Sequence, residues 1–135
     1  MGEQAQNEAV ERIKKEFTGL EISGKQSTDN KFDITGTYQG KEISFEVKWD
    51  IMAEKTGNVA IEYESRGKMS GISVTKACYW IYKISGKFYL IKTEKIKEGI
   101  NNKAYHRNVT GGDYGSNTKM YLITVPKFVS WGKEI

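Results

Sequence analysis

The sequence predicts an α/β domain with a mixed sheet, in which an N-terminal helix is followed by a three-stranded antiparallel meander and then by a further helix and strands. Apolar residues recur at spacings of three and four over residues 3–17, which indicates an amphipathic helix that Gly19 ends. Residues 31–50 alternate between apolar and polar on both sides of Gln39-Gly40, which indicates a hairpin. Residues 58–64 alternate again and predict the third strand.

Composition sets the broad class. The chain has 135 residues and 38% hydrophobic residues, which predicts one globular domain over residues 1–135. Its net charge of +4 weakly favours a polyanionic partner. One cysteine, Cys78, cannot form an internal disulfide, so we expect a cytoplasmic setting and a small core residue at that position. No apolar run resembles a signal peptide or a membrane span, so we expect a soluble protein without a membrane partner.

One face of the predicted hairpin carries the side chains that could take part in a reaction. Its expected strands are residues 31–38 and 41–49, and side chains alternate between faces along a strand. One face of the second strand carries apolar side chains. The opposite face of the hairpin carries two carboxylates and an amine: Asp33, Glu46 and Lys48.

Two carboxylates on neighbouring strands, with a lysine beside them, suit a divalent cation. Mg²⁺ takes one or two carboxylates and fills its other positions with water and phosphate oxygens, and Mn²⁺ is a close alternative. Lys48 would then hold or deprotonate an attacking water and offset charge on the phosphorus. The alternative is a solvated face on which Glu46 and Lys48 pair with cross-strand neighbours.

Asp33, followed after twelve residues by Glu46-Val47-Lys48, resembles the motif of the PD-(D/E)XK nuclease superfamily, which includes many restriction endonucleases and Holliday-junction resolvases. The run TGNVAIEYESRGKMSGISVTKACYWIYK, residues 56–83, is similar to phage and bacterial nuclease-like sequences of this superfamily. The resemblance covers about residues 5–100. Phe32 stands where the proline of the family name is expected.

The resemblance implies a restriction endonuclease-like αβββαβ core and a set of residue roles. Asp33 and Glu46 would be metal ligands together with the Val47 carbonyl, and Lys48 would orient the water. Several members of the superfamily carry a helical glutamate that supports the metal site, and Glu8 lies at about the right distance before Asp33. A solvated surface carboxylate is the alternative for Glu8.

The resemblance also suggests a DNA contact and an assembly. Residues 24–30 form a polar loop of the kind that lies near the cleft in this superfamily, so Lys25 would touch a DNA backbone, with a solvated loop as the alternative. A homodimer follows by analogy, because cutting both strands needs two sites.

The third strand adds a further candidate. If residues 58–64 lie beside the Glu46 strand, Glu62 or Glu64 joins the polar face, and Glu62 is nearer the strand centre. Carboxylates gathered on one face repel one another unless a cation or a basic partner neutralises them. The alternative is an exposed strand with two ordinary glutamates.

Basic residues follow this strand. Arg66, Lys68 and Lys76 bracket a turn and short helix over residues 70–77, and beside a metal pocket they would hold phosphates. As isolated surface cations they would have no such role. Residues 78–84 and 88–92 predict a second hairpin whose aromatic residues we expect in the core, with stacking on bases as the alternative.

The rest of the chain is less specific. Thr93 caps an expected helix over residues 94–100. Residues 101–117, which include Arg107, are either a mobile surface loop or a flap that engages DNA. Residues 120–125 predict a final strand, and the apolar tail after it either packs onto the domain or lines a dimer contact.

These observations lead us to expect a Mg²⁺- or Mn²⁺-dependent DNA endonuclease, with junctions or branched DNA among its candidate substrates. A catalytically inactive nucleic-acid-binding or interaction module on the same fold is the main alternative. A nuclease that acts on RNA is a third.

Overall fold

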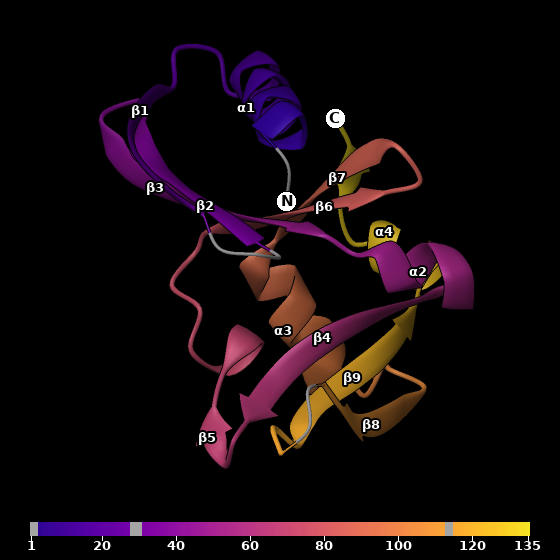
Figure 1. The fold of residues 1–135 in the computed structure, drawn as a ribbon. Helices are drawn as coiled ribbons and strands as arrows, with labels where there is room; N and C mark the ends of the chain where they lie inside the picture. The colour runs from indigo at the N-terminus through magenta and orange to yellow at the C-terminus, as the bar shows by residue number, and fades with distance from the viewer. Residues whose placement is uncertain (1–2, 28–30, 113–114) are drawn as a thin grey trace.

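The structure is a computed structural model that describes residues 3–27, 31–112 and 115–135, and it has a mixed α+β fold with two sheets (Figure 1). The helices are α1 (Glu3–Glu16), α2 (Ile51–Thr56), α3 (Thr93–Asn101) and α4 (Val125–Val129), with one 3-10 turn, η1 (Gly71–Ser73). The strands are β1 (Glu21–Ser27), β2 (Lys31–Tyr38), β3 (Lys41–Trp49), β4 (Asn58–Ser65), β5 (Lys68–Met69), β6 (Tyr79–Ile84), β7 (Lys87–Lys92), β8 (Arg107–Gly111), β9 (Thr118–Thr124) and β10 (Lys133–Glu134).

The larger sheet is mixed. Its six strands run in the order β1-β2-β3-β6-β7-β10, with β3 and β6 parallel and the other neighbours antiparallel. The smaller sheet has four antiparallel strands in the order β5-β4-β9-β8. In Figure 1, α1 lies above the six-stranded sheet, and the four-stranded sheet and α3 lie below it.

The helix and the central hairpin are confirmed. Helix α1 forms where the spacing of apolar residues predicts it, and it buries Ala5, Ala9 and Ile13. The turn between β2 and β3 has positive φ at Gln39 (53°) and Gly40 (78°), the geometry of a two-residue hairpin turn. This turn sets the register, in which Asp33 lies opposite Glu46.

Two expectations about the meander are wrong. The segment expected as a polar loop over residues 24–30 is strand β1 as far as Ser27, paired with β2, while residues 28–30 lie outside the described residues. The strand at Asn58–Ser65 exists, but it pairs with β9 and β5 in the four-stranded sheet and does not lie beside β3. The meander beside α1 is therefore β1-β2-β3.

Other expectations need correction in detail. The helix expected over residues 70–77 is only η1, and β8 occupies part of the region expected as a loop over residues 101–117. Thr93 begins α3 without capping it, and its hydroxyl donates to the Ala77 carbonyl at 2.6 Å. Cys78 is exposed and is not a core residue. The apolar tail packs onto the domain, since Phe128 of α4 is fully buried.

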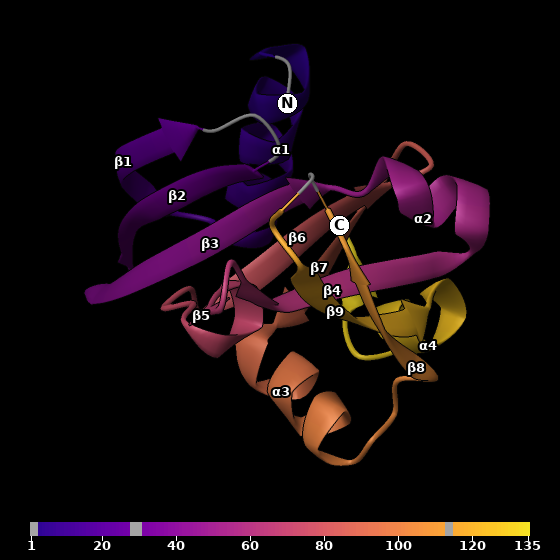
Figure 2. The same cartoon turned by 60° about the horizontal axis from the view of Figure 1, so that its bottom comes forward.

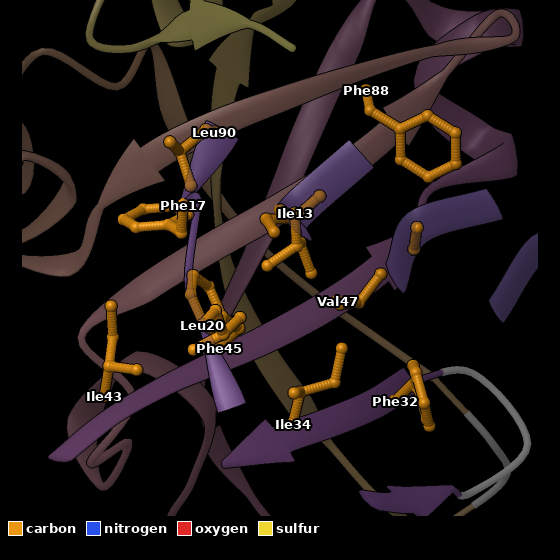
Figure 3. Close-up of a cluster of buried hydrophobic side chains, with 12 residues drawn as sticks. Ile13, Phe17, Leu20, Phe32, Ile34, Ile43, Phe45, Val47, Phe88 and Leu90 are labelled. Carbon is orange, nitrogen blue, oxygen red and sulfur yellow. The ribbon is translucent and has the colours of Figure 1, made fainter. Parts of the chain in front are cut away.

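Two apolar cores lie on the two faces of the six-stranded sheet. The first joins α1 to this sheet, and Figure 3 shows side chains from α1 pointing toward those of β2 and β3, such as Phe45 and Val47. The second fills the space toward the four-stranded sheet and α3, which are turned toward the viewer in Figure 2, and it includes Trp80, Tyr82 and Ile96. Burial of these faces is the main force that holds the sheets together.

None of the helices within the described residues is long and apolar enough to cross a membrane.

Candidate functional site

The hairpin brings Asp33, Glu46 and Lys48 to one place. Asp33 of β2 and Glu46 of β3 are directly paired in the register, so their side chains share a face of the sheet. Lys48 follows on the same face, with its Nζ 3.6 Å from Glu46 Oε2. This is the face opposite α1, because the intervening residues Phe45 and Val47 belong to the core under α1.

Lys48 is held on two sides. Its ammonium is half-buried beside the buried Glu46 carboxylate, and it also lies 4.7 Å from the centre of the Trp80 ring on β6. Trp80 is the register partner of Glu46 on the parallel neighbour strand. An ammonium is attracted to the face of an indole ring. The site therefore offers a positioned cation next to a positioned carboxylate.

Asp50, which follows the last residue of β3, lies two positions after Lys48 in the sequence. Its carboxylate accepts hydrogen bonds from the backbone N–H of Ala53 at 3.0 Å and of Ala60 at 3.3 Å, so it caps α2 and reaches β4 as well. Burial raises the pKa of Asp50 above its usual range, while these two hydrogen bonds and the charge of Lys48 act in the opposite direction. Asp50 thus joins the candidate site to the second sheet.

The floor beneath Lys48 and Asp50 is aromatic. Tyr82 lies opposite Lys48 in the register and stacks on Trp80, with ring centres 6.1 Å apart. Burial raises the pKa of the Tyr82 hydroxyl well above its usual range, and the charges of Asp50 and Glu46 raise it further. The Tyr82 hydroxyl and the Trp80 Nε1 are buried without a hydrogen-bond partner among the described residues.

A cleft of about 780 Å³ opens over the two carboxylates. Its floor is the polar face of β2 and β3, and its far wall is the segment that runs from Gly71 to Cys78. Thr75 in this wall donates a hydrogen bond to Glu46 Oε1 at 3.4 Å, which orients the carboxylate. Ser44 binds the same wall, because its carbonyl accepts the Cys78 N–H at 2.9 Å. The cleft therefore lies between the β2–β3 hairpin and a largely irregular segment that these hydrogen bonds hold to β3.

The donor set fits a magnesium-type ion and not a closed metal cage. No group of three or more His, Cys, Asp or Glu side chains that could hold a metal occurs in the part of the chain that is described. Two carboxylates with the remaining positions left to water and phosphate is the usual arrangement for Mg²⁺. Val47 lies in a strand paired on both sides, so its carbonyl would have to use a second lone pair.

The two further glutamates proposed from the sequence lie elsewhere. Glu8 on α1 pairs with Lys83 at 3.9 Å and with Arg12 at 4.0 Å, and Lys83 is on the α1 side of the sheet. The sheet therefore separates Glu8 from Asp33 and Glu46. Glu62 is in β4 of the other sheet, although its backbone borders Gly71 of the cleft wall.

The basic residues proposed from the sequence are spread over four regions. Lys76 lines the cleft, and Arg66 and Lys68 are exposed at the turn into β5, on the chain leading to the cleft wall. Lys25 is paired with Ile34, so Gln26 is the β1 residue that lies opposite Asp33. Arg107 is exposed on β8, an edge strand of the four-stranded sheet.

Two residues of the site were missed by sequence reasoning. Asp50 continues the alternation of Glu46 and Lys48 by two positions, and this signal was available in the sequence. Thr75 had no such signal, because only the path of the chain between β5 and β6 brings it to Glu46.

Comparison of the chain with models of protein families, with curated proteins and with solved structures found no match, so the site rests on its own geometry.

Proposed function

We propose that this chain is a metal-dependent endonuclease that hydrolyses phosphodiester bonds in DNA. The observation that carries the proposal is the direct pairing of Asp33 with Glu46 across β2 and β3, with Lys48 3.6 Å from Glu46 on the same face. Two oxygen ligands and an adjacent ammonium are the groups that metal-assisted hydrolysis of a phosphodiester needs.

The order of elements supports the same proposal. The sequence resemblance implies an αβββαβ core, and α1, β1, β2, β3, α2 and β6 occur in that order along the chain, with β4, β5 and η1 inserted between α2 and β6 and with β6 parallel to β3. The acidic residues then lie on the second and third strands of the meander. The segments that fill these positions differ from those expected, because β1 replaces β4 as a member of the meander.

The charge of the cleft favours a cation-dependent reaction over simple binding of an anion. Among the described residues, its lining includes three carboxylates, Asp33, Glu42 and Glu46, and one cation, Lys76, while Lys48 pairs with Glu46 beside it. A phosphate group entering this cleft alone would lie close to the Glu42 and Glu46 carboxylates, and like charges repel at short range. A divalent cation on Asp33 and Glu46 would offset this repulsion.

Each residue then has a defined role. Bound Mg²⁺ would supply Lewis acidity at the scissile phosphate. The carboxylates of Asp33 and Glu46 hold the ion, and the Thr75 hydroxyl fixes the orientation of Glu46. The Lys48 ammonium, aligned by Glu46 and Trp80, orients the attacking water and offsets charge at the phosphorus. Lys76 at the cleft contacts a neighbouring phosphate.

The test is a cleavage panel with Mg²⁺ or Mn²⁺ on linear, flapped and four-way DNA, with single-stranded DNA and RNA beside them. Lys48→Ala and Glu46→Gln should each lower the rate by roughly 10²–10⁴-fold, because each removes a group that acts on the transition state. Glu42→Gln is the matched control, since Glu42 is on the same face of β3 and also lines the cleft. It should retain cleavage.

Absence of metal-dependent cleavage by the wild-type chain on every substrate would remove the hydrolase proposal and leave the inactive binding module. Cleavage of RNA alone would change the substrate and keep the site. A homodimer would place two such sites in one particle, and sedimentation equilibrium with and without a four-way junction measures whether it forms.

A further inference from the structure

A second hollow lies beside the six-stranded sheet, with its sheet residues on the face opposite the carboxylates and with Lys95 and Trp131 coming from the side of α3. It has a volume of about 480 Å³, within the range of small-molecule sites, and it lies between the end of α1, the edge of the sheet and the segment after α4. Four aromatic residues line it: Phe17, Tyr38, Tyr79 and Trp131. Tyr38 and Tyr79 belong to the α1 side of the sheet.

These rings are held in place by their neighbours. Phe17 makes edge contacts with Tyr38 and with Tyr79, each with ring centres 5.2 Å apart, and Tyr79 also stacks on Phe45 at 5.6 Å. Trp131 packs against Gly99 of α3 so closely that a Cβ at Gly99 would lie 2.4 Å from the indole. Rings fixed in this way lose little conformational entropy when a flat ligand stacks on them.

Cations surround the same hollow. Lys92, Lys95 and Lys133 line it, and all three are exposed. Among the described residues of its lining, Glu16 is the one acidic residue, and it forms an ion pair with Lys133. Lys95 pairs with Glu98 at 3.8 Å, so the excess of positive charge in the lining lies at Lys92. A smaller hollow of about 280 Å³ shares Lys95 and Trp131 with this one.

We propose that this hollow, the aromatic–lysine groove, binds a nucleotide, with the base against Tyr79 and Trp131 and the phosphate at Lys92 and Lys95. A flat, electron-rich base stacks on aromatic side chains whatever its identity, and lysines beside the stack hold the phosphate. A free nucleotide and a nucleotide within a single strand share this chemistry. The proposal does not rest on the hydrolase activity, because the groove and the carboxylate cleft have no lining residue in common among the described residues.

The test measures binding in EDTA by calorimetry, so that neither metal nor cleavage contributes. The probes are thymidine 5′-monophosphate, thymidine, inorganic phosphate and an oligothymidylate of about 8 nucleotides, a length within the usual site size for single strands. The variant is Lys92→Ala with Lys95→Ala. The matched control is Lys87→Ala with Lys97→Ala, which removes the same charge from exposed positions on the same strand, β7, and the same helix, α3, outside the groove.

The Lys92/Lys95 variant should bind the monophosphate about tenfold more weakly or worse, while the Lys87/Lys97 control should bind as the wild type does. For the oligothymidylate, the slope of log K against log salt should become shallower by about 1.4, since each phosphate contact to a single strand contributes about 0.7. Binding of the monophosphate but not of the oligomer would assign the groove to free nucleotides.

Three results would overturn the proposal: no binding of any probe, an equal loss in both double variants, or inorganic phosphate binding as tightly as the nucleotide. The last would show that the aromatic residues contribute nothing. Circular dichroism melting of both double variants checks that the fold is kept. Because the measurement uses no metal, a chain without cleavage activity can still pass it.

Discussion

Substitution of Gly71 tests whether close packing of the cleft wall against the β4 backbone stabilises the fold. Gly71 has φ +53°, and a Cβ placed there would lie 2.2 Å from the Glu62 carbonyl oxygen and 2.8 Å from its carbonyl carbon. Both contacts are to backbone, so no change of side-chain rotamer relieves them. Gly67, four residues earlier, has φ +74° and would place its Cβ in open space.

The two glycines therefore separate backbone strain from steric clash. Gly67→Ala should destabilise the fold by about 1–2 kcal/mol, the cost of a left-handed conformation for a residue with a Cβ. Gly71→Ala carries the same cost, and it must also displace η1 from β4, which adds about 1–3 kcal/mol. The expected difference between the variants is therefore about 1–3 kcal/mol.

Urea unfolding followed by circular dichroism measures both values on the same scale. Equal losses of unfolding free energy in the two variants would refute the reasoning, because the contact with Glu62 would then contribute nothing. In the folded population, Gly71→Ala should also reduce cleavage more than Gly67→Ala, since displacement of the wall moves Thr75 away from Glu46.

Three further predictions concern the site. Mn²⁺ at ten times its dissociation constant should stabilise the wild type by about 1.4 kcal/mol and raise the melting temperature by about 4–6 °C, whereas Asp33→Asn with Glu46→Gln should show no shift in differential scanning fluorimetry. Tyr82→Phe should be neutral or stabilising by about 1 kcal/mol in urea unfolding, because the buried hydroxyl has no partner among the described residues; a loss above about 2 kcal/mol would contradict this. Asp50→Asn should destabilise the fold more at pH 4 than at pH 7. The raised pKa means that the stability given by neutral Asp50 is present at low pH and is lost as pH rises above about 4. An equal or larger effect at pH 7 in urea unfolding would exclude this sign.

The central hairpin could be predicted from the sequence because its determinants are local. The Gln39-Gly40 turn fixes the pairing of β2 with β3, and alternation then assigns every side chain to a face. The opposition of Asp33 and Glu46 follows directly from that register. The central part of the candidate site was therefore accessible before any coordinates.

The partner of β4 could not be predicted in the same way. Alternation of Val59 and Ile61 shows that one face of the strand is buried, but it does not say against which sheet. The answer depends on β9, whose residues are far away in the sequence. Expecting β4 beside β3 placed Glu62 next to Glu46, and the pairing with β9 removes that neighbour relation.

Strand β1 was missed for a different reason. Its sequence, EISGKQS, contains a glycine and several polar residues, which have low strand propensity. It is a strand because β2 offers an unpaired edge for its backbone, and its side chains are largely exposed. Cys78 was misplaced because a small apolar residue beside two aromatic residues suggests a core position, whereas it precedes β6 and lines the cleft.

The parallel pairing of β3 with β6 has a consequence for how the chain folds. The connection between these strands contains β4, which pairs with β9 along most of its length. The hairpin that carries the acidic residues can form early from local contacts, but the wall that faces it depends on residues 118–124. During synthesis, a nascent chain would thus carry the carboxylates before the cleft wall that orients them has formed. The complete site would form only after residues 118–124 have been synthesised.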